Sequence, residues 1–178
     1  MKVLVIVDVQ NDFVNGTLGT KEAEAIIEQL VNKIKSFDGI VFLTKDTHEK
    51  NYLSTQEGKK LPVEHCIRGT PGWEVESRVM EAIKEKGLDY KIIEKGTFGS
   101  LQLGEHIAKL HDTEKIEQIE FVGICTDICV ISNALIVKAM LPEVPIRVDA
   151  ACCAGVTPET HKAALATMKS CQIEVIND

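Results

Sequence analysis

Short apolar segments alternate with longer amphipathic segments along the whole chain, and this alternation limits the folds that the chain can adopt. We expect strands at Lys2–Val7, Gly39–Thr44, Asp89–Glu94, Gln118–Gly123, Ile146–Asp149 and Gln172–Ile176. We expect helices at about Lys21–Ser36, Trp73–Lys86, Gln102–His111, Asp127–Met140 and Pro158–Ser170. This order predicts an α/β fold, a three-layer doubly wound sheet of about six mainly parallel strands with helices on both faces.

Composition narrows the class of protein. The length of 178 residues, 44% of them hydrophobic, fits one domain, residues 1–178, with a substantial core. A net charge of -7 disfavours nucleic acid and anionic membranes as partners. No apolar run is long enough to span a membrane, and the N-terminal run lacks the cleavage site of a signal peptide. The 6 cysteines have irregular spacing, which predicts free thiols in a reducing cytoplasm.

Three chemically distinctive side chains lie at or just past the ends of expected strands. Asp8 follows the first strand, Lys95 follows the third, and Cys129 follows the fourth. In an open parallel sheet, ligands bind at the carboxyl ends of the strands. The order of the chain could therefore bring an acid, a cation and a thiol together.

Cys129 is expected in the first turn of a helix that Thr126 or Asp127 would cap. A thiol at a helix N-terminus tends to have a lowered pKa, and the thiolate is the nucleophilic form. Taken one at a time, each of the three residues also has a simpler interpretation. Cys129 could be buried and inert, Asp8 a helix cap, and Lys95 a solvated surface residue. All three alternatives together are much less probable than any one of them.

The irregular stretch between Asp46 and Gly72 raises the question of a metal ion. Asp46 and His48 are two residues apart, so an extended chain would orient both the same way. His65 follows, and Glu57 lies between. Two imidazoles and a carboxylate suit Zn²⁺, Fe²⁺ or Mn²⁺. Spacing alone is a weak signal, because a histidine in a loop is more often a surface residue.

Five motifs occur in the order in which a known family has them, and they cover most of the chain. They are D-V-Q-N-D-F at 8–13, D-T-H at 46–48, E-H-C-I-R-G-T-P-G at 64–72, K-G-T-F at 95–98 and G-I-C-T-D-I-C-V at 123–130. In these motifs the sequence resembles the isochorismatase-like cysteine hydrolases, and within them the nicotinamidases (pyrazinamidases).

The resemblance implies an amidase that hydrolyses a small carboxamide. The expected substrate is nicotinamide, which would be converted to nicotinate and ammonia in NAD salvage. It implies that Cys129 is the nucleophile, that Asp8 accepts its proton and that Lys95 holds Asp8 ionised. It also implies an oxyanion site at the backbone N–H groups of Cys125 and Cys129, with a cis peptide bond between Ile124 and Cys125.

The same resemblance implies a divalent metal ion, with Zn the first choice and Fe or Mn as alternatives. Its ligands would be Asp46, His48 and His65, and Glu57 is the candidate for a further carboxylate ligand. The pyridine nitrogen of the substrate would bind this metal. A homo-oligomer is also expected, because family members are often dimers or larger.

The sequence departs from the nicotinamidase pattern at two places. The Trp-Pro pair that commonly precedes the histidine matching His65 is absent, and the only tryptophan, Trp73, lies beyond the Gly-Thr-Pro-Gly turn. Phe13 and Phe98 are the remaining candidates for contact with a substrate ring, although core packing explains each about as well. Cys125 lies close to the nucleophile and is either inert or able to form a reversible disulfide with Cys129.

Three hypotheses for function follow. The first is a metal-dependent nicotinamidase. The second is a cysteine amidase of the same fold that acts on another small amide or a ureido compound. The third is a doubly wound binding or redox protein with structural cysteines. A nucleotide-binding module has little support, since neither G-x-G-x-x-G after the first strand nor a P-loop is present.

Overall fold

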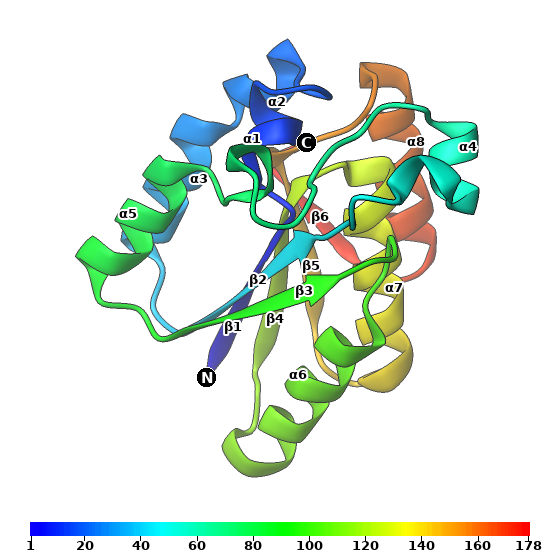
Figure 1. Cartoon of the computed structure of the whole chain (residues 1–178). Coiled ribbons are helices and arrows are strands. Elements are labelled where there is room, and N and C mark those ends of the chain that lie inside the picture. The colour runs from blue at the N-terminus through cyan, green and yellow to red at the C-terminus, as the bar shows by residue number, and fades with distance from the viewer.

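The computed structural model describes all 178 residues and contains one six-stranded sheet of order β3-β2-β1-β4-β5-β6 (Figure 1). All five strand pairs are parallel, which confirms the predicted fold class. The strands are β1 (Lys2–Val7), β2 (Ile40–Asp46), β3 (Tyr90–Lys95), β4 (Gln118–Ile124), β5 (Ile146–Ala154) and β6 (Glu174–Ile176). Because the order reverses beside β1, the carboxyl ends of β1 and β4 open the crevice in which such sheets bind ligands.

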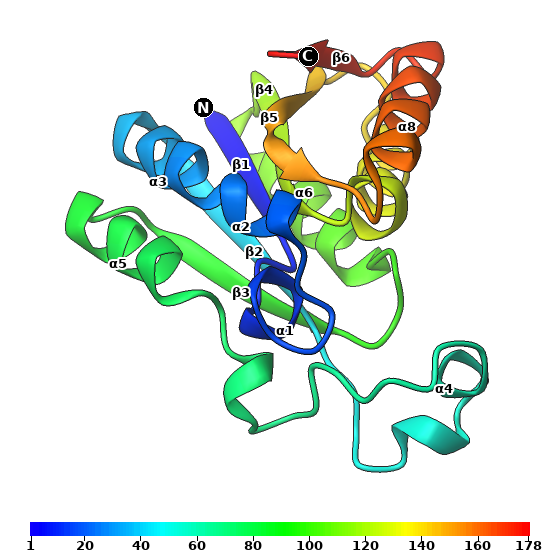
Figure 2. The same ribbon diagram turned by 90° about the horizontal axis from the view of Figure 1, so that it is seen from above.

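Helices cover both faces of the sheet (Figure 2). They are α1 (Asn11–Val14), α2 (Lys21–Ala25), α3 (Ile27–Ser36), α4 (Gln56–Lys60), α5 (Ser77–Lys86), α6 (Leu101–Glu114), α7 (Ile131–Met140) and α8 (Pro158–Ser170). Two 3₁₀ turns, η1 (Tyr52–Ser54) and η2 (Pro71–Trp73), and one π-helical turn, η3 (Thr126–Val130), complete the set. Helices α3 and α5 lie on one face, and α6, α7 and α8 lie on the other.

The two apolar cores follow from the period of two along a strand. On β1, Leu4 and Ile6 pack with the residues of α3 and α5. Val3, Val5 and Val7 point the opposite way and pack with the residues of α6, α7 and α8. A central strand that is apolar on both faces is what a parallel sheet between two helical layers requires.

The expected helices exist, but four of them have different boundaries, and α6 extends beyond the expected Gln102–His111 at both ends. The helix expected at Lys21–Ser36 is divided at Ile26 into α2 and α3. The helix expected from Trp73 begins at Ser77 instead, because the carboxylate of Glu76 accepts a hydrogen bond from the N–H of Val79 and so caps it there. The segment expected as one helix at Asp127–Met140 is the π-helical turn η3 followed by α7.

The close approach of β4 to β1 depends on Gly123. Its φ of +121° and a Cβ position only 2.2 Å from the carbonyl oxygen of Val7 leave no room for a side chain. Asp8 is the next residue after Val7, so this contact places the end of β4 directly beside the end of β1.

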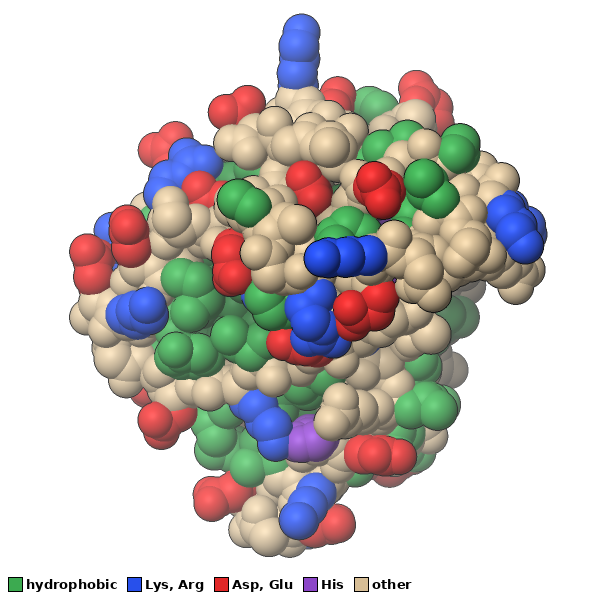
Figure 3. Space-filling view, in the orientation of Figure 1, with side chains coloured by type: hydrophobic (Ala, Val, Ile, Leu, Met, Phe, Trp, Pro, Cys, Tyr) green, Lys and Arg blue, Asp and Glu red, His purple; other side chains and the backbone are tan.

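The surface carries both signs of charge. On the face shown in Figure 3, acidic side chains lie between the lysines and arginines, and no broad basic patch forms there. No helix has the length and apolar character needed to cross a membrane. All six cysteines are free, as expected.

Candidate active site

The structure brings Asp8, Lys95 and Cys129 together at the carboxyl ends of β1, β3 and β4. Nζ of Lys95 lies 2.6 Å from Oδ2 of Asp8 and 3.5 Å from Sγ of Cys129. All three side chains are buried. The acid, the cation and the thiol expected from the sequence therefore form one contiguous cluster.

Asp8 is held in place by its backbone and by its neighbour on β2. Its φ of 49° is unusual for a residue other than glycine, and it directs the chain out of β1 toward α1. Oδ1 accepts a hydrogen bond of 2.6 Å from the hydroxyl of Thr44. Burial raises the pKa of Asp8, while the charge of Lys95 and the hydrogen bond from Thr44 act in the opposite direction. Asp8 is not a helix cap, because no side-chain bond caps α1.

Lys95 is buried rather than solvated, which excludes the simpler interpretation of this residue. Its ammonium group donates to the carbonyl oxygen of Thr97 at 3.0 Å and lies 3.8 Å from Oδ1 of Asp46. Burial opposes the charged form, but the charges of Asp8, Cys129 and Asp46 outweigh it and raise the pKa of Lys95. Lys95 is therefore a fixed positive charge between two carboxylates.

The surroundings of Cys129 differ from the expectation of a lowered thiol pKa. Burial, followed by the charge of Asp8, raises the pKa of Cys129 well above its ordinary value, and Lys95 offsets only part of this effect. The cap prediction is also wrong. The hydroxyl of Thr126 pairs with Nδ1 of His161 at 2.8 Å, and Asp127 accepts from the N–H of Val156 at 3.1 Å. These surroundings favour the protonated thiol, which lies beside the carboxylate of Asp8.

Asn133 ties the turn of Cys129 to the loop that follows Lys95. Its side-chain amide donates to the carbonyl oxygens of Cys129 at 2.8 Å and Phe98 at 3.2 Å. Its Oδ1 accepts from the N–H of Ser100 at 2.9 Å. Since Asn133 is completely buried, these bonds fix the position of two active-site segments relative to each other.

Asp46, His48 and His65 form a buried group whose ligand atoms all lie within 4.8 Å of one another. Oδ2 of Asp46 is 3.0 Å from Nε2 of His48 and 3.5 Å from Nε2 of His65. Ligands bound about 2.0–2.2 Å from one Zn²⁺ in a tetrahedron lie roughly 3.3–3.6 Å apart, so these separations suit a shared ion.

Two further observations fit a metal ion at this point. Nε2 of His48 is buried and has no hydrogen-bond partner. Nδ1 of His65 lies 2.8 Å from the carbonyl oxygen of Val63, which only accepts, so Nδ1 carries the proton and Nε2 offers its lone pair. Although burial opposes its ionisation, the neighbouring His48 and His65 and the charge of Lys95 hold the pKa of Asp46 well below its usual range. The donor set fits a divalent metal ion.

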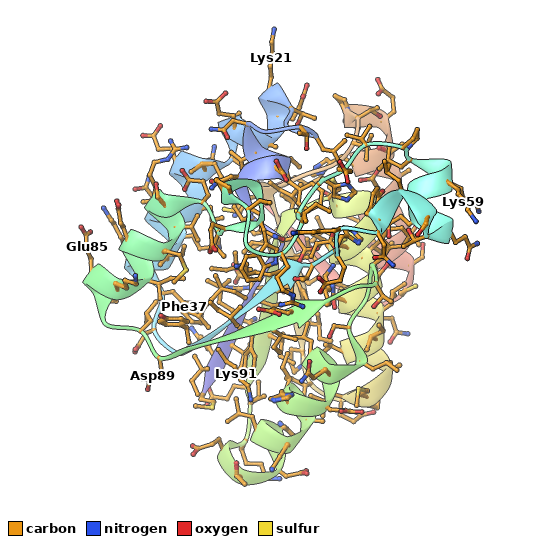
Figure 4. All side chains as sticks on the ribbon, viewed as in Figure 1. Lys21, Phe37, Lys59, Glu85, Asp89 and Lys91 are labelled. Carbon is orange, nitrogen blue, oxygen red and sulfur yellow. The ribbon has the colours of Figure 1, made fainter.

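Glu57 faces this group from α4. Its Oε1 lies 3.6 Å from Nε2 of His48 and 3.8 Å from Nε2 of His65. On the same short helix, Lys59 points away into solvent (Figure 4). Helix α4 therefore turns its carboxylate inward, and the role of Glu57 as a ligand stays a prediction.

Tyr52 packs against both His48 and His65, although no motif in the sequence indicates this role. Its ring centroid lies 4.6 Å from that of His48 and 5.0 Å from that of His65. Its hydroxyl donates to the carbonyl oxygen of Leu61 at 2.9 Å. Burial and the charges of Glu57 and Asp46 raise the pKa of Tyr52 to about 12, so it is a neutral donor at physiological pH.

Gln10 and Trp73 hold the strand end that bears Asp46. The amide of Gln10 accepts from the backbone N–H of Asp46 at 2.7 Å and donates to its carbonyl oxygen at 2.8 Å. The indole N–H of Trp73 donates to Thr47 at 2.8 Å, and Nζ of Lys45 lies 3.1 Å from the centre of the indole ring. Trp73 therefore neither faces the core nor lines the cavity described next.

A cavity of about 300 Å³ opens beside these groups. The buried Asp46, His65 and Cys129 line it, together with the partly buried Cys125. Both Phe13 and Phe98 line it, and the ring centroid of Phe13 is 5.5 Å from that of His65. The cavity is lined by Phe13, Leu18, Thr20, Asp46, Glu57, Leu61, His65, Phe98, Cys125, Ile128, Cys129 and Val156.

The peptide bond between Ile124 and Cys125 is cis, as the family resemblance implies. The N–H of Cys125 makes no hydrogen bond within the chain. Since Cys125 lines the cavity, this unpaired donor lies close to Cys129 and is free to bind an oxygen atom of a ligand.

Comparison with known proteins gives one family over nearly the entire chain. The sequence model of the isochorismatase domain matches residues 2–177. The nicotinamidase/pyrazinamidase of Mycobacterium tuberculosis is 30% identical over 188 residues, which covers 99% of this chain and 98% of that protein.

Solved structures agree with the sequence relatives. The nicotinamidase/pyrazinamidase of Bacillus subtilis is 26% identical and superposes with a TM-score of 0.80, covering 98% of both chains. The pyrazinamidase of Pyrococcus horikoshii, solved in complex with zinc, is 26% identical with a TM-score of 0.77 over 99% of both chains.

Proposed function

Because this chain belongs to the isochorismatase family of hydrolases, we propose that it is an amidohydrolase that converts nicotinamide to nicotinate and ammonia. One observation carries the proposal: the ammonium group of Lys95 lies within 3.5 Å of both Asp8 and Cys129, and Cys129 lines a cavity that Asp46 and His65 of the metal-donor set also line. The names of the relatives in Mycobacterium tuberculosis and Bacillus subtilis support the choice of substrate.

In the proposed reaction, Asp8 takes the proton from the thiol of Cys129 as sulfur attacks the carboxamide carbon. The raised pKa of Cys129 makes this general base necessary, because little thiolate is present beforehand. Lys95 stabilises the negative charge that passes between Asp8 and sulfur. The backbone N–H groups of Cys125 and Cys129 are proposed to bind the oxyanion of the tetrahedral intermediate.

The carboxyl group of Asp8 then returns its proton to the leaving nitrogen, and ammonia departs from a thioester on Cys129. A water molecule, deprotonated by Asp8, attacks the thioester carbonyl. The carbon–sulfur bond breaks, sulfur recovers the proton from Asp8, and nicotinic acid is released, which loses its own proton to the solvent and becomes nicotinate. Asp8 thus carries the proton in each step that takes place on the enzyme.

A metal ion held by Asp46, His48 and His65, with Glu57 as a further ligand, would bind and polarise the pyridine nitrogen. We propose zinc, which the imidazole and carboxylate donors suit and which the Pyrococcus horikoshii relative contains, with iron or manganese as alternatives. Phe13 and Phe98 are proposed to contact the ring.

We also propose a single domain over residues 1–178, a cytoplasmic location and a homo-oligomer. The one continuous sheet supports the first of these, and the six free cysteines support the second. The oligomer stays a prediction from the resemblance and is tested by light scattering of the purified protein.

The decisive test is ammonia release from nicotinamide by the metal-loaded protein, with Cys129→Ala as the control. Turnover that disappears in the variant supports the proposal. If the protein releases no ammonia but Cys129 still reacts with an alkylating agent at alkaline pH, the alternative is a cysteine amidase for another small amide. If Cys129 is unreactive as well, the remaining alternative is a binding protein.

A further inference from the structure

Asp12 belongs to the motif D-V-Q-N-D-F at 8–13, but the proposed reaction does not use it. It lies on α1, in the segment that follows Asp8, and α1 packs beside the turn η2 (Figure 1). Its Oδ2 accepts a hydrogen bond of 2.8 Å from the backbone N–H of Cys66. This bond joins the segment after the proposed base to the loop that carries His65.

Cys66 is linked to both histidines of the proposed metal site. It follows His65 in the chain, and its carbonyl oxygen accepts a hydrogen bond of 3.0 Å from the backbone N–H of His48. Cys66 is completely buried, and its φ of 47° lies in the left-handed region that residues other than glycine seldom adopt. Because no water reaches this residue, its N–H depends on the carboxylate of Asp12 for a hydrogen bond.

Two glycines leave the space that the carboxylate of Asp12 occupies. A Cβ on Gly72 would lie 2.2 Å from Oδ2 of Asp12, and a Cβ on Gly16 would lie 2.6 Å from Oδ1. Both distances are far below van der Waals contact, so a methyl group at either position would displace the carboxylate. Gly72 ends the motif E-H-C-I-R-G-T-P-G at 64–72, so this motif and the one that contains Asp12 fit each other at this contact.

The same segment also supports the third proposed ligand. The side chain of Gln10 bonds to both the N–H and the carbonyl oxygen of Asp46. The backbone of every residue in the Asp46–His48–His65 donor set is therefore bonded to Gln10 or lies next to, or is bonded to, the residue that Asp12 holds. Groups that orient metal ligands typically change metal affinity 10–100-fold when they are removed, as an order of magnitude of about one to two decades.

We propose that Asp12 is a positioning residue for the metal site. Through the N–H of Cys66 it fixes the backbone that joins His48 and His65, and so holds both imidazoles in place before an ion binds. The inference rests on the metal site of the proposed function. It means that the segment that supplies the base Asp8 also maintains the metal site, and that loss of Asp12 weakens metal binding although no ligand is removed.

The test measures the Kd of Zn²⁺ on the metal-free protein by competition with a chromophoric chelator, so it does not depend on turnover. Asp12→Ala should raise this Kd about 10–100-fold. Asp12→Asn also removes the charge but retains an oxygen acceptor for the N–H of Cys66, so it should recover most of the lost affinity. Wild-type affinity in Asp12→Ala overturns the inference, and an equal loss in Asp12→Asn contradicts the role of the hydrogen bond.

Asn11→Ala is the matched control for a general loosening of the same loop. The side-chain amide of Asn11 donates to the carbonyl oxygen of Pro71 at 2.8 Å, away from both histidines in the chain. Its removal should leave the Kd of Zn²⁺ unchanged. A loss as large as that in Asp12→Ala would mean that Asp12 has no specific role.

Gly72→Ala tests the same contact without removal of the carboxylate, and it decides the question if Asp12→Ala does not fold. Its methyl group should displace the carboxylate and raise the Kd of Zn²⁺ about tenfold or more. Added to Asp12→Ala, it should have little further effect, because no carboxylate is left to displace. Wild-type affinity in Gly72→Ala, or additive losses in the double variant, contradicts the inference.

Failure of this inference can be distinguished from failure of the proposed function. If the wild type and Asp12→Ala bind Zn²⁺ equally well, only the inference about Asp12 is overturned. If the wild type binds none of Zn²⁺, Fe²⁺ and Mn²⁺, the proposed metal site is wrong, and the inference is wrong with it.

Discussion

The ammonium group of Lys95 lies 2.6 Å from the carboxylate of Asp8, and both side chains are buried. Burial alone would favour the neutral forms of both groups, so each helps to keep the other charged. The same ammonium group is 3.5 Å from the sulfur of Cys129. The pair therefore places a base and a compensating charge at the nucleophile.

The charges around Cys129 predict opposite effects of two substitutions on its reaction with iodoacetamide. The charge of Asp8 raises the pKa of the thiol, and that of Lys95 lowers it. At pH 8, Asp8→Asn should therefore be alkylated at Cys129 faster than the wild type, and Lys95→Gln more slowly. Both variants should lose about 10²–10⁴-fold in kcat/KM. Peptide mass spectrometry measures the alkylation, and equal rates in all three proteins would refute this account of the thiol.

The pH profile should report the environment of Asp8. Burial raises its pKa, so the basic form is lost as pH falls through a value above the ordinary one of 3.8. The decline in kcat/KM on the acid side should therefore begin at a higher pH than a solvated carboxyl group would give. The apparent value belongs to Asp8, Lys95 and Cys129 together.

Thr44→Val should move this acid decline to still higher pH, because the hydroxyl of Thr44 stabilises the ionised carboxylate. Thr113→Val, at an exposed position on α6, is the control and should leave the profile unchanged. A profile that is identical in Thr44→Val and the wild type would mean that Asp8 is not the group that titrates.

Metal binding should stabilise the folded protein through His48. Zn²⁺ at a hundred times its Kd should raise the free energy of unfolding by about 2.7 kcal/mol, measured by urea denaturation. His48→Asn should abolish this stabilisation, and Glu57→Gln should weaken it. His106→Asn, on the exposed face of α6, should have no effect. Full stabilisation in His48→Asn would exclude the proposed ligand set.

Asn133 should be important both for stability and for turnover. Asn133→Leu keeps the approximate volume but leaves the buried N–H of Ser100 without an acceptor. We expect the free energy of unfolding to fall by about 2–3 kcal/mol. Because Cys129 also loses a restraint on its carbonyl group, kcat should fall more than KM changes. A stable variant with normal kcat would show that this link is dispensable.

Much of the architecture could be predicted because it depends on local patterns. The strand Lys2–Val7 and the helix Pro158–Ser170 have the predicted boundaries. At the start of this helix, the side chain of Thr157 accepts a hydrogen bond from the N–H of Thr160, and the side chain of Thr160 accepts one from the N–H of Thr157. Pro158 occupies the first turn. Both features can be recognised in the sequence alone.

The parts that could not be predicted depend on contacts between distant residues. The bonds of Thr126 to His161 and of Asp127 to Val156 replace the expected helix cap and favour a π-helical turn. The raised pKa of Cys129 results from burial among groups of three strands, which no local pattern shows. Tyr52 supports the histidines through ring contacts, and in the sequence it is only a tyrosine in a long loop.

The most direct test of the central claim, that Cys129 is acylated with Asp8 as its base, is rapid-quench mass spectrometry of the metal-loaded protein mixed with nicotinamide. The account predicts a transient increase in mass equal to one nicotinoyl group, located on Cys129. It should be absent from Cys129→Ala and form more slowly in Asp8→Asn. Steady release of ammonia by Cys129→Ala, or a nicotinoyl group on another residue, would contradict the account.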